Sequence, residues 1–310
     1  MNKILVTGGA GFIGSNLVLE LQEKYPEAAI TVIDDFRSGD FKNLREFQGD
    51  VVAADMAELD WKKQFGEPEW DAVFHIASIT DTTCHDQKLQ VRDNVESFRN
   101  LLEFVKPKKT PVIYATSAAT YGIAARKNTE KDALNPANVY AFSKMILENL
   151  ARRYSKENPK WKIIGLRYFN VYGPREAHKG VPASMIYHLA QQMSAGKRPR
   201  LFKYGEQKRD FVYVKDIVNY TIATLKSKTV SGVFNAGTGT PRAFNDIVAI
   251  LNKLLKTNLE IEYFDNPYPF YQSYTEASMT RAHAALGIKP KFTLESGIRD
   301  YFQSGFLVGK

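Results

Sequence analysis

The sequence contains only one cysteine, Cys84, among 310 residues. The chain can therefore form no disulfide within itself, and no histidine or aspartate motif marks Cys84 as a nucleophile. Disulfides accumulate in oxidising compartments, whereas free thiols are the rule in the cytoplasm. We therefore predict a cytoplasmic protein.

Long hydrophobic runs are also absent. No apolar stretch approaches the ~18 residues that mark a membrane-spanning helix. The first apolar stretch, Ile4–Val6, ends at Thr7 and Gly8, and the polar residues Asn16 and Glu20 follow. This pattern is typical of a strand that enters a turn, so we predict neither a targeting peptide nor a membrane anchor.

The chain is basic, with a net charge of +8 and a pI of about 9.2, but it has no basic run and no aromatic-basic motif. Lysine and arginine are scattered among acidic residues, which argues against nucleic acid as a partner. A positive balance attracts anions in general. We expect a nucleotide cofactor and a phosphorylated small substrate, with no metal.

Short apolar strands alternate with helices over the first 170 residues. We predict strands at 3–7, 30–34, 51–55, 72–76, 112–116 and 162–167, and helices at 13–24, 93–105 and 140–154. Apolar strands separated by helices are typical of an α/β protein with a doubly wound parallel sheet. The predicted fold class is therefore Rossmann-like.

Beyond residue 170 the pattern is less regular, with Pro174, Gly180 and Pro182 in one stretch. Helices are predicted at 184–195 and 246–255, and a strand at 210–214. No repeat and no low-complexity linker separates this part from the rest. We predict an NAD(P)-binding domain at 1–170 plus about 211–240, and a smaller, mainly C-terminal substrate-binding domain at 171–210 plus about 241–310.

Three glycines, Gly8, Gly11 and Gly14, join the first predicted strand to the first predicted helix. Glycines at such a junction let the backbone turn tightly and approach a diphosphate. The helix N-terminus then offers free N–H groups and its positive dipole end to the anion. The spacing G-x-x-G-x-x-G therefore indicates a dinucleotide site.

Charged residues after the second strand leave the choice of dinucleotide open. Asp34 ends that strand, and a carboxylate there usually binds the adenosine ribose, which favours NAD. Arg37 and Lys42 lie just beyond it and can instead hold a 2′-phosphate, which favours NADP. Three further residues follow the third and fourth strands and are predicted to contact the cofactor: Asp55, Ala77 and Ser78.

A tyrosine and a lysine form the predicted catalytic site. Tyr140 and Lys144 are four residues apart in a predicted helix, so they lie on one face. A lysine cation lowers the pKa of a neighbouring tyrosine hydroxyl. Tyr140 can then take a proton from a substrate hydroxyl while hydride leaves the same carbon. Ser117 ends the fifth strand, where ligands of such sheets bind, and can align that hydroxyl.

A second set of polar residues follows the sixth strand. Asn170 is a candidate hydrogen-bond donor to substrate or cofactor, and Arg209 is suited to a diphosphate. Lys179, beside Gly180, is either a second acid/base or a solvated lysine. His188 either faces a substrate phosphate or packs within its helix.

Together these motifs resemble those of the extended short-chain dehydrogenase/reductases that act on nucleotide sugars. The resemblance covers essentially the whole chain and rests on the glycine turn, Ser117, Tyr140 with Lys144, Arg167–Arg175 and Arg209–Val214. It implies inversion of a sugar carbon, C6 of an ADP-bound heptose, through a transient ketone. It also implies a tightly held NADP and a homo-oligomer, a pentamer.

The resemblance also assigns roles to individual residues, with Tyr140 and Lys179 as the two acid/base residues. Val181 stands where the family has a small polar residue, and residues 76–80 depart from the family pattern. The implied cofactor contacts are Phe12, Ile13, Asp34, Asp35, Asn94, Lys144, Val171 and Lys179. The implied substrate contacts are Ser117, Asn170, Val181, His188, Phe202, Arg209 and Tyr271.

Two other functions stay open on the sequence alone. Epimerisation of a UDP-sugar at C4 is the nearest enzymatic alternative in the same family. A cofactor-binding regulator without catalysis is the alternative from another class, and the retention of Ser117, Tyr140 and Lys144 argues against it. Dehydration is disfavoured because Ala118 and Ala119 stand where an acidic pair is needed to eliminate water.

Overall fold

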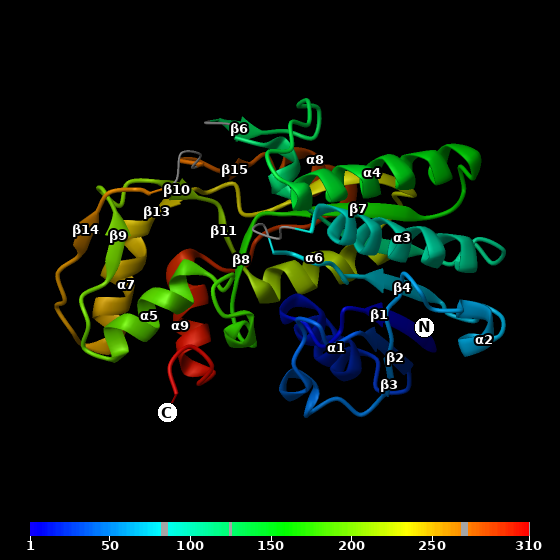
Figure 1. The fold of residues 1–310 in the computed structure, drawn as a ribbon, viewed down its shortest axis with the longest axis horizontal. Coiled ribbons are helices and arrows are strands. Elements are labelled where there is room, and N and C mark those ends of the chain that lie inside the picture. The colour runs from blue at the N-terminus through cyan, green and yellow to red at the C-terminus, as the bar shows by residue number, and fades with distance from the viewer. Residues whose placement is uncertain (82–85, 124–125, 268–271, 310) are drawn as a thin grey trace.

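The structure is a computed structural model that describes residues 1–81, 86–123, 126–267 and 272–309. Cys84 and Tyr271, which the sequence analysis discussed, lie outside the described residues. Helices flank a central sheet, and a smaller group of helices and short strands lies beyond one end of it (Figure 1). Within the described ranges, no helix combines the length and apolar composition that a membrane crossing requires.

Seven parallel strands form the central sheet, in the order β12-β7-β5-β4-β1-β2-β3. The strand order reverses between β1 and β4, and ligands of doubly wound sheets bind at such a reversal. The strands are β1 (Lys3–Thr7), β2 (Ala29–Asp34), β3 (Asp50–Ala53), β4 (Ala72–His75), β5 (Val112–Ser117), β7 (Ile163–Tyr168) and β12 (Ser231–Ala236).

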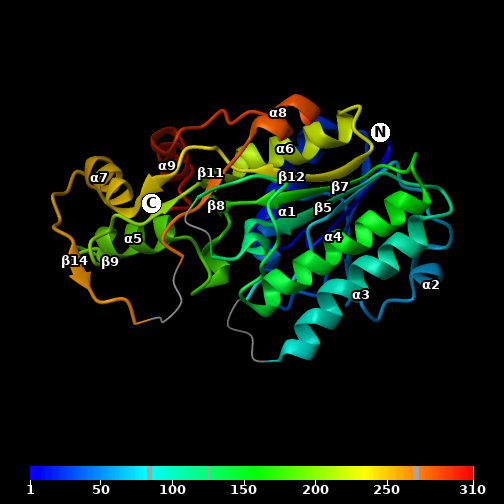
Figure 2. The same ribbon diagram turned by 90° about the horizontal axis from the view of Figure 1, so that it is seen from above.

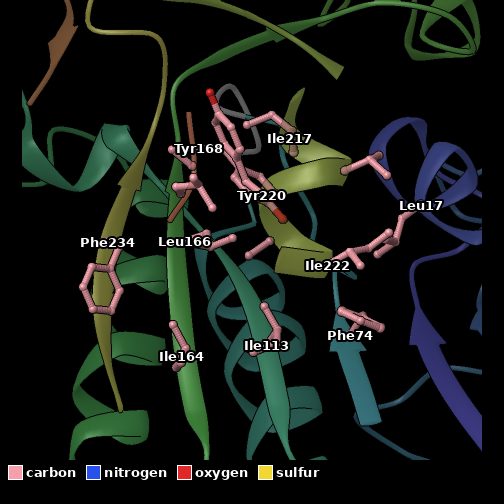
Figure 3. Close-up of a cluster of buried hydrophobic side chains, with 14 of the residues drawn as sticks. Leu17, Phe74, Ile113, Ile164, Leu166, Tyr168, Ile217, Tyr220, Ile222 and Phe234 are labelled. Atoms are coloured by element: carbon pink, nitrogen blue, oxygen red, sulfur yellow. The ribbon is translucent and has the colours of Figure 1, made fainter. Parts of the chain in front are cut away.

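Helices cover both faces of the sheet, which is why its central strands are apolar throughout. One face packs against α1 (Phe12–Lys24) and α6 (Val214–Lys226), and the other against α3 (Gln87–Val105) and α4 (Val139–Glu157) (Figure 2). Figure 3 shows the first of these interfaces, where Leu17 and Ile222 approach the sheet residues Phe74 and Ile113. Burying each such side chain stabilises the fold by roughly 1.5–3 kcal/mol.

The C-terminal part has its own hydrophobic core between α5 (Met185–Ser194), α7 (Phe244–Leu255) and α9 (Leu294–Gln303). Within the described residues, four short strand pairs lie outside the central sheet. They are β8 (Asn170–Tyr172) with β11 (Phe211–Tyr213), β9 (Arg200–Phe202) with β14 (Glu262–Phe264), β10 (Lys208–Arg209) with β13 (Arg242–Ala243), and β6 (Lys127–Asn128) with β15 (Glu276–Ala277). The remaining elements are η1 (Phe41–Leu44), α2 (Trp61–Phe65), η2 (Ala118–Tyr121), η3 (Ala177–Lys179) and α8 (Thr280–Leu286).

The predicted doubly wound parallel sheet is confirmed, and the six predicted strands are all present. The seventh strand, β12, was not predicted because it is an edge strand interrupted by Gly232, whose φ is +135°. Helix α3 begins at Gln87, earlier than predicted, because the Asp86 side chain caps it by accepting a hydrogen bond from the Leu89 N–H at 2.8 Å. A polar first turn hides such a start from a search for apolar periodicity.

Candidate active site

A pocket of about 320 Å³ lies at the carboxyl end of the sheet, where the strand order reverses. Its walls come from the glycine turn, from the ends of β4 and β5, from α4 and from the chain after β7. It gathers residues that are far apart in the sequence. The lining residues are Phe12, Ile13, Ile76, Ser78, Thr80, Ala115, Thr116, Ser117, Tyr140, Lys144, Tyr168, Phe169, Val171, Lys179 and Pro182.

The glycine turn leads into Phe12 and Ile13, which line the pocket at the start of α1. Gly8 has φ +70°, and a Cβ there would lie 2.6 Å from the Ala77 backbone. A Cβ on Gly14 would lie 1.9 Å from the Gly8 carbonyl oxygen. Gly11 is the N-cap of α1 and has no side chain with which to cap it. The first amides of α1 are therefore available to an anion at the helix N-terminus.

Asp34 lies at the end of β2 and is buried. Its carboxylate accepts hydrogen bonds from the Ala10 N–H and the Phe36 N–H, each at 2.9 Å. Burial raises the pKa of Asp34, and these backbone hydrogen bonds oppose the rise. The side chain thus fixes the glycine turn against β2, a structural task that is separate from any contact with a ribose.

Arg37 is surrounded by carboxylates. Its guanidinium lies 2.5 Å from the Asp93 carboxylate and 3.2 Å from those of Asp35 and Asp55. These acids raise the pKa of Arg37, and the hydrogen bond that Arg37 donates to Asp93 has the largest effect. Lys42 follows in η1 and is exposed, as Arg37 is. Asp93, which comes from α3, was not predicted, because nothing in the local sequence links it to Arg37.

Asn94 holds the active-site helix in place instead of lining the pocket. Its Oδ1 accepts from the Ile79 N–H at 2.7 Å, and its Nδ2 donates to Ser143 Oγ at 2.9 Å. Ser143 Oγ in turn donates to the Tyr140 carbonyl oxygen at 2.8 Å. Of the other predicted contacts after β4, Ser78 lines the pocket, and the Ala77 N–H donates to Thr7 Oγ1 at 3.3 Å.

Tyr140 and Lys144 both face the pocket from the first turns of α4, which begins at the Asn138 cap. Lys144 Nζ lies 5.9 Å from the centre of the Tyr140 ring and donates to the Ala115 carbonyl oxygen at 3.0 Å. Burial raises the pKa of Tyr140, and a hydrogen bond with Ser117 opposes the rise. The expected lowering by Lys144 is not seen, because that lysine is itself fully desolvated and its pKa falls to about 7.

A buried ion pair supports this corner of the pocket. Glu148, one turn beyond Lys144 on α4, accepts from Arg167 Nε at 2.9 Å, from Arg167 Nη2 at 2.6 Å and from Thr116 Oγ1 at 2.8 Å. Its charge opposes the lowering of the Lys144 pKa. We did not predict Glu148, although its spacing of four residues from Lys144 on the same helix face was a usable signal.

Lys179 lines the same pocket as Tyr140 and Lys144 but comes from a different element, the short turn η3. Its Nζ is 5.5 Å from the centre of the Phe12 ring. Burial lowers the pKa of Lys179, and the nearby Glu176 carboxylate opposes the fall. The sequence alone left two interpretations of Lys179, a second acid/base and a solvated surface lysine. Its partial burial in the pocket that Tyr140 also lines favours the first.

The other predicted substrate contacts that the structure describes are not among the residues that line the pocket. Asn170 Oδ1 accepts from Thr275 Oγ1 at 3.0 Å, and His188 Nε2 lies 3.1 Å from the Val181 carbonyl oxygen. Val181 itself is 91% exposed, although its neighbour Pro182 lines the pocket. On the C-terminal elements, the Phe202 ring packs 4.9 Å from that of Phe264, and Arg209 Nη1 donates to the Lys208 carbonyl oxygen at 3.0 Å.

Comparison with known proteins decides what kind of site this is. Residues 4–237 match the model of the NAD dependent epimerase/dehydratase family. The chain belongs to this family. Its members use a nicotinamide cofactor, and the glycine turn fits one, since side chains at Gly8 and Gly14 would collide with the backbone that forms the cradle.

Three relatives within the family are informative. A protein of Alkalilimnicola ehrlichii named ADP-L-glycero-D-manno-heptose-6-epimerase is 38% identical, over 97% of each chain. The crystal structure of ADP-L-glycero-D-manno-heptose-6-epimerase from Helicobacter pylori has a TM-score of 0.91 and 40% identity, over 98% of this chain and 96% of that one. The UDP-glucuronic acid 4-epimerase of Bacillus cereus, solved with UDP-glucuronic acid and NAD, has a TM-score of 0.85 and 29% identity, over 97% and 99%.

The desolvated lysine of this family site predicts a pH-dependent stability of the cofactor-free protein. The pKa of Lys144 is about 7 in the folded state, against 10.5 for an ordinary lysine. Between these values the unfolded chain binds more protons, so this group makes the free energy of unfolding rise with pH. Lys144→Met should flatten that rise, as measured by urea unfolding from about pH 7 to pH 10.

The control, Lys156→Met, removes an exposed lysine of the same helix and should leave the slope unchanged. Parallel curves for Lys144→Met and the wild type would contradict the desolvation of Lys144.

Proposed function

We propose that the protein is a nucleotide-sugar isomerase that interconverts ADP-D-glycero-D-manno-heptose and ADP-L-glycero-D-manno-heptose by transient oxidation at C6. The observation that carries the proposal is the pairing of Tyr140 and Lys179 in one pocket. Inversion through a ketone needs proton transfer on both faces of one carbon, and two acid/base groups from different elements supply it. The names of the Alkalilimnicola and Helicobacter relatives support the choice of sugar.

On one side of the pocket, Tyr140 takes the proton of the C6 hydroxyl. A nicotinamide cofactor held at the glycine turn would supply the redox chemistry of this step, reversible hydride transfer at the same carbon. Ser117 hydrogen-bonds the same hydroxyl and aligns it, and Lys144 supports the tyrosinate as it forms. The Asn94 and Ser143 contacts keep the first turn of α4, and with it Tyr140, at the end of β5.

On the other side, Lys179 exchanges the proton of the epimeric hydroxyl. The sugar ketone turns between the two half-reactions, so hydride returns to its opposite face. A desolvated lysine is suited to this role because burial brings its pKa down toward neutral pH. The ADP group extends toward Arg209 and its neighbours on the C-terminal elements.

The leading alternative is 4-epimerisation of a UDP-sugar, the activity named for the Bacillus cereus relative. Heptose epimerisation is preferred because proteins with that name match at 36–40% identity over nearly the whole chain. Incubating the purified enzyme with a panel of ADP- and UDP-sugars, followed by product analysis, separates the two. We expect turnover of the ADP-heptose alone. Turnover of UDP-sugars without turnover of ADP-heptose would reject the proposal.

We further propose that NADP is the preferred cofactor, bound with its 2′-phosphate between Arg37 and Lys42. Asp34 is engaged with the backbone, and the carboxylates around Arg37 hold its guanidinium at the end of β2. Arg37→Ala should therefore weaken NADP binding at least ~10-fold more than NAD binding, the scale of one lost charge-assisted contact. The control is Arg200→Ala, which removes an arginine paired with Glu262 at 3.0 Å on the distant β9.

Titration of the cofactor-free protein with each nucleotide, followed by fluorescence or calorimetry, measures both constants. The Arg200→Ala control should bind the two nucleotides as the wild type does. Tighter binding of NAD than of NADP by the wild type would overturn the NADP proposal. In that case the carboxylates of Asp35, Asp55 and Asp93 would neutralise the charge of Arg37, so that Arg37 could not attract a 2′-phosphate.

A further inference from the structure

Glu176 is a fully buried carboxylate just outside the pocket, and no role has yet been given to it. One of its oxygens accepts from the Gly173 N–H at 3.1 Å and from Ser184 Oγ at 2.9 Å. The other accepts from the Ser184 N–H at 2.6 Å. A buried carboxylate is costly unless it is well hydrogen-bonded, so this one holds firmly the groups that satisfy it.

These contacts close a loop, because Gly173 and Ser184 are the two ends of a single segment. Ser184 also caps α5 by accepting from the Tyr187 N–H at 3.2 Å, so the far end of the segment is fixed to a helix. Between the two ends lies η3, whose first turn is held by a hydrogen bond from the Lys179 N–H to the Glu176 carbonyl oxygen at 3.0 Å. Glu176 is thus bonded to both ends and to the middle of the segment that carries Lys179.

We propose that Glu176 is a positioning residue that holds Lys179 in the pocket wall, where its amine reaches the hydroxyl oxygen on the substrate carbon. This inference rests on the proposed function, since it assumes that Lys179 is the second acid/base residue. Glu176 is not among the residues that line the pocket, so it acts through the segment that it closes.

The carboxylate also influences Lys179 electrostatically. Its negative charge raises the pKa of Lys179 against the effect of burial. His178, the neighbour of Lys179, has a pKa that burial lowers. Among the described residues, the other titratable side chains that line the pocket are Tyr140 and Lys144 on α4 and Tyr168 at the end of β7. Tyr172 and Tyr301 face Glu176 itself, and burial together with its charge raises the pKa of both. In a plot of rate against pH, one limb should reflect the titration of Lys179. Removing the charge of Glu176 while keeping its shape should therefore move this limb to lower pH.

The test compares the two half-reactions of the cofactor-loaded enzyme. Each heptose epimer is added separately, and reduction of the bound nicotinamide is followed by its absorbance. Lys179→Met identifies the epimer whose oxidation depends on Lys179. We expect Glu176→Ala to slow oxidation of that same epimer about 100-fold, the scale of a misplaced catalytic group, and to leave oxidation of the other epimer near the wild-type rate. A loss of general structure would slow both.

Two milder variants keep the test decisive if Glu176→Ala folds poorly. Glu176→Gln keeps most of the side-chain shape, so its rate should be much closer to the wild-type rate than that of Glu176→Ala. The limb of its pH–rate profile that reflects Lys179 should lie at lower pH. Ser184→Ala removes one tether and keeps the charge, so it should slow the Lys179-dependent half-reaction without moving the limb. The control is Asp216→Asn, which weakens a buried carboxylate that accepts from the Lys291 N–H at 2.9 Å and the Phe292 N–H at 3.1 Å, away from the pocket.

The outcomes separate this inference from the function on which it rests. The Glu176 and Ser184 variants could slow both half-reactions equally, as the Asp216→Asn control does if its effect is a general loss of structure. That result would overturn the positioning role of Glu176 and leave Lys179 as the acid/base residue. Wild-type rates in every Glu176 variant would overturn it as well. Full activity in Lys179→Met would instead reject the proposed mechanism itself.

Discussion

Turnover should fall at least ~100-fold when Tyr140 is replaced by phenylalanine, the scale of a lost general acid/base. The substitution keeps the ring, which faces the pocket, and removes only the hydroxyl to which we assign proton exchange with the substrate. Because the Tyr140 carbonyl still accepts from Ser143, the first turn of α4 should keep its place. Steady-state turnover of the ADP-heptose, with thermal unfolding as the check on folding, measures the effect.

Tyr204→Phe is the matched control for this experiment. Tyr204 and Lys208 repeat the spacing of Tyr140 and Lys144, but Tyr204 is 64% exposed and lies outside the pocket lining. The control should turn over substrate at the wild-type rate. Near-wild-type turnover in Tyr140→Phe would place the acid/base group elsewhere.

Net epimerisation should fall below detection when Lys179 is replaced by methionine, because one face of the sugar ketone then has no proton donor or acceptor. One half-reaction should survive, since Tyr140 remains intact on the other side of the pocket. Methionine preserves much of the apolar length that packs near Phe12, so the loop should keep its shape. Product analysis of each epimer after long incubation shows the loss, and a burst of reduced cofactor with only one epimer shows the surviving half.

Lys215→Met provides the corresponding control, because Lys215 is a half-exposed lysine of α6 that pairs with Asp300 at 2.7 Å. It should epimerise the substrate normally. Full activity in Lys179→Met would remove that lysine from the mechanism and leave Tyr140 as the acid/base for both faces.

The parts of the candidate site that the sequence could propose are those that local sequence sets. Gly8, Gly11 and Gly14 depend on one strand-turn-helix junction, and Tyr140 with Lys144 depends on the pitch of one helix. Ser117 needed only the position of a strand end. Each of these features is set within a few residues of chain, so spacing and residue type suffice to find it.

Contacts between distant segments were harder to foresee. The pairing of Arg37 with Asp93 depends on how α3 packs against the end of β2, and no local pattern encodes it. Asn94 was predicted as a cofactor contact, yet its side chain joins Ile79 to Ser143. Residue type alone cannot say which way a side chain points once tertiary packing decides it.

The substrate contacts were the least predictable part. Asn170 and Arg209 come from short strands whose partners lie far along the chain, β11 and β13. Such pairings have little periodicity of their own, because strands of two or three residues present too few side chains to form a pattern. The roles of these residues stay predictions until a nucleotide sugar is bound.

The central claim, inversion of C6 through transient oxidation, is tested most directly by NMR of the product formed in deuterated water. The enzyme is incubated with ADP-D-glycero-D-manno-heptose, and both the configuration and the carbon-bound hydrogen at C6 are determined. Hydride that leaves C6 and returns to it does not exchange with solvent, so we predict inverted C6 that still carries protium. Inversion with deuterium at C6 would contradict transient oxidation, and an unchanged C6 alongside conversion of UDP-glucose to UDP-galactose would contradict the substrate.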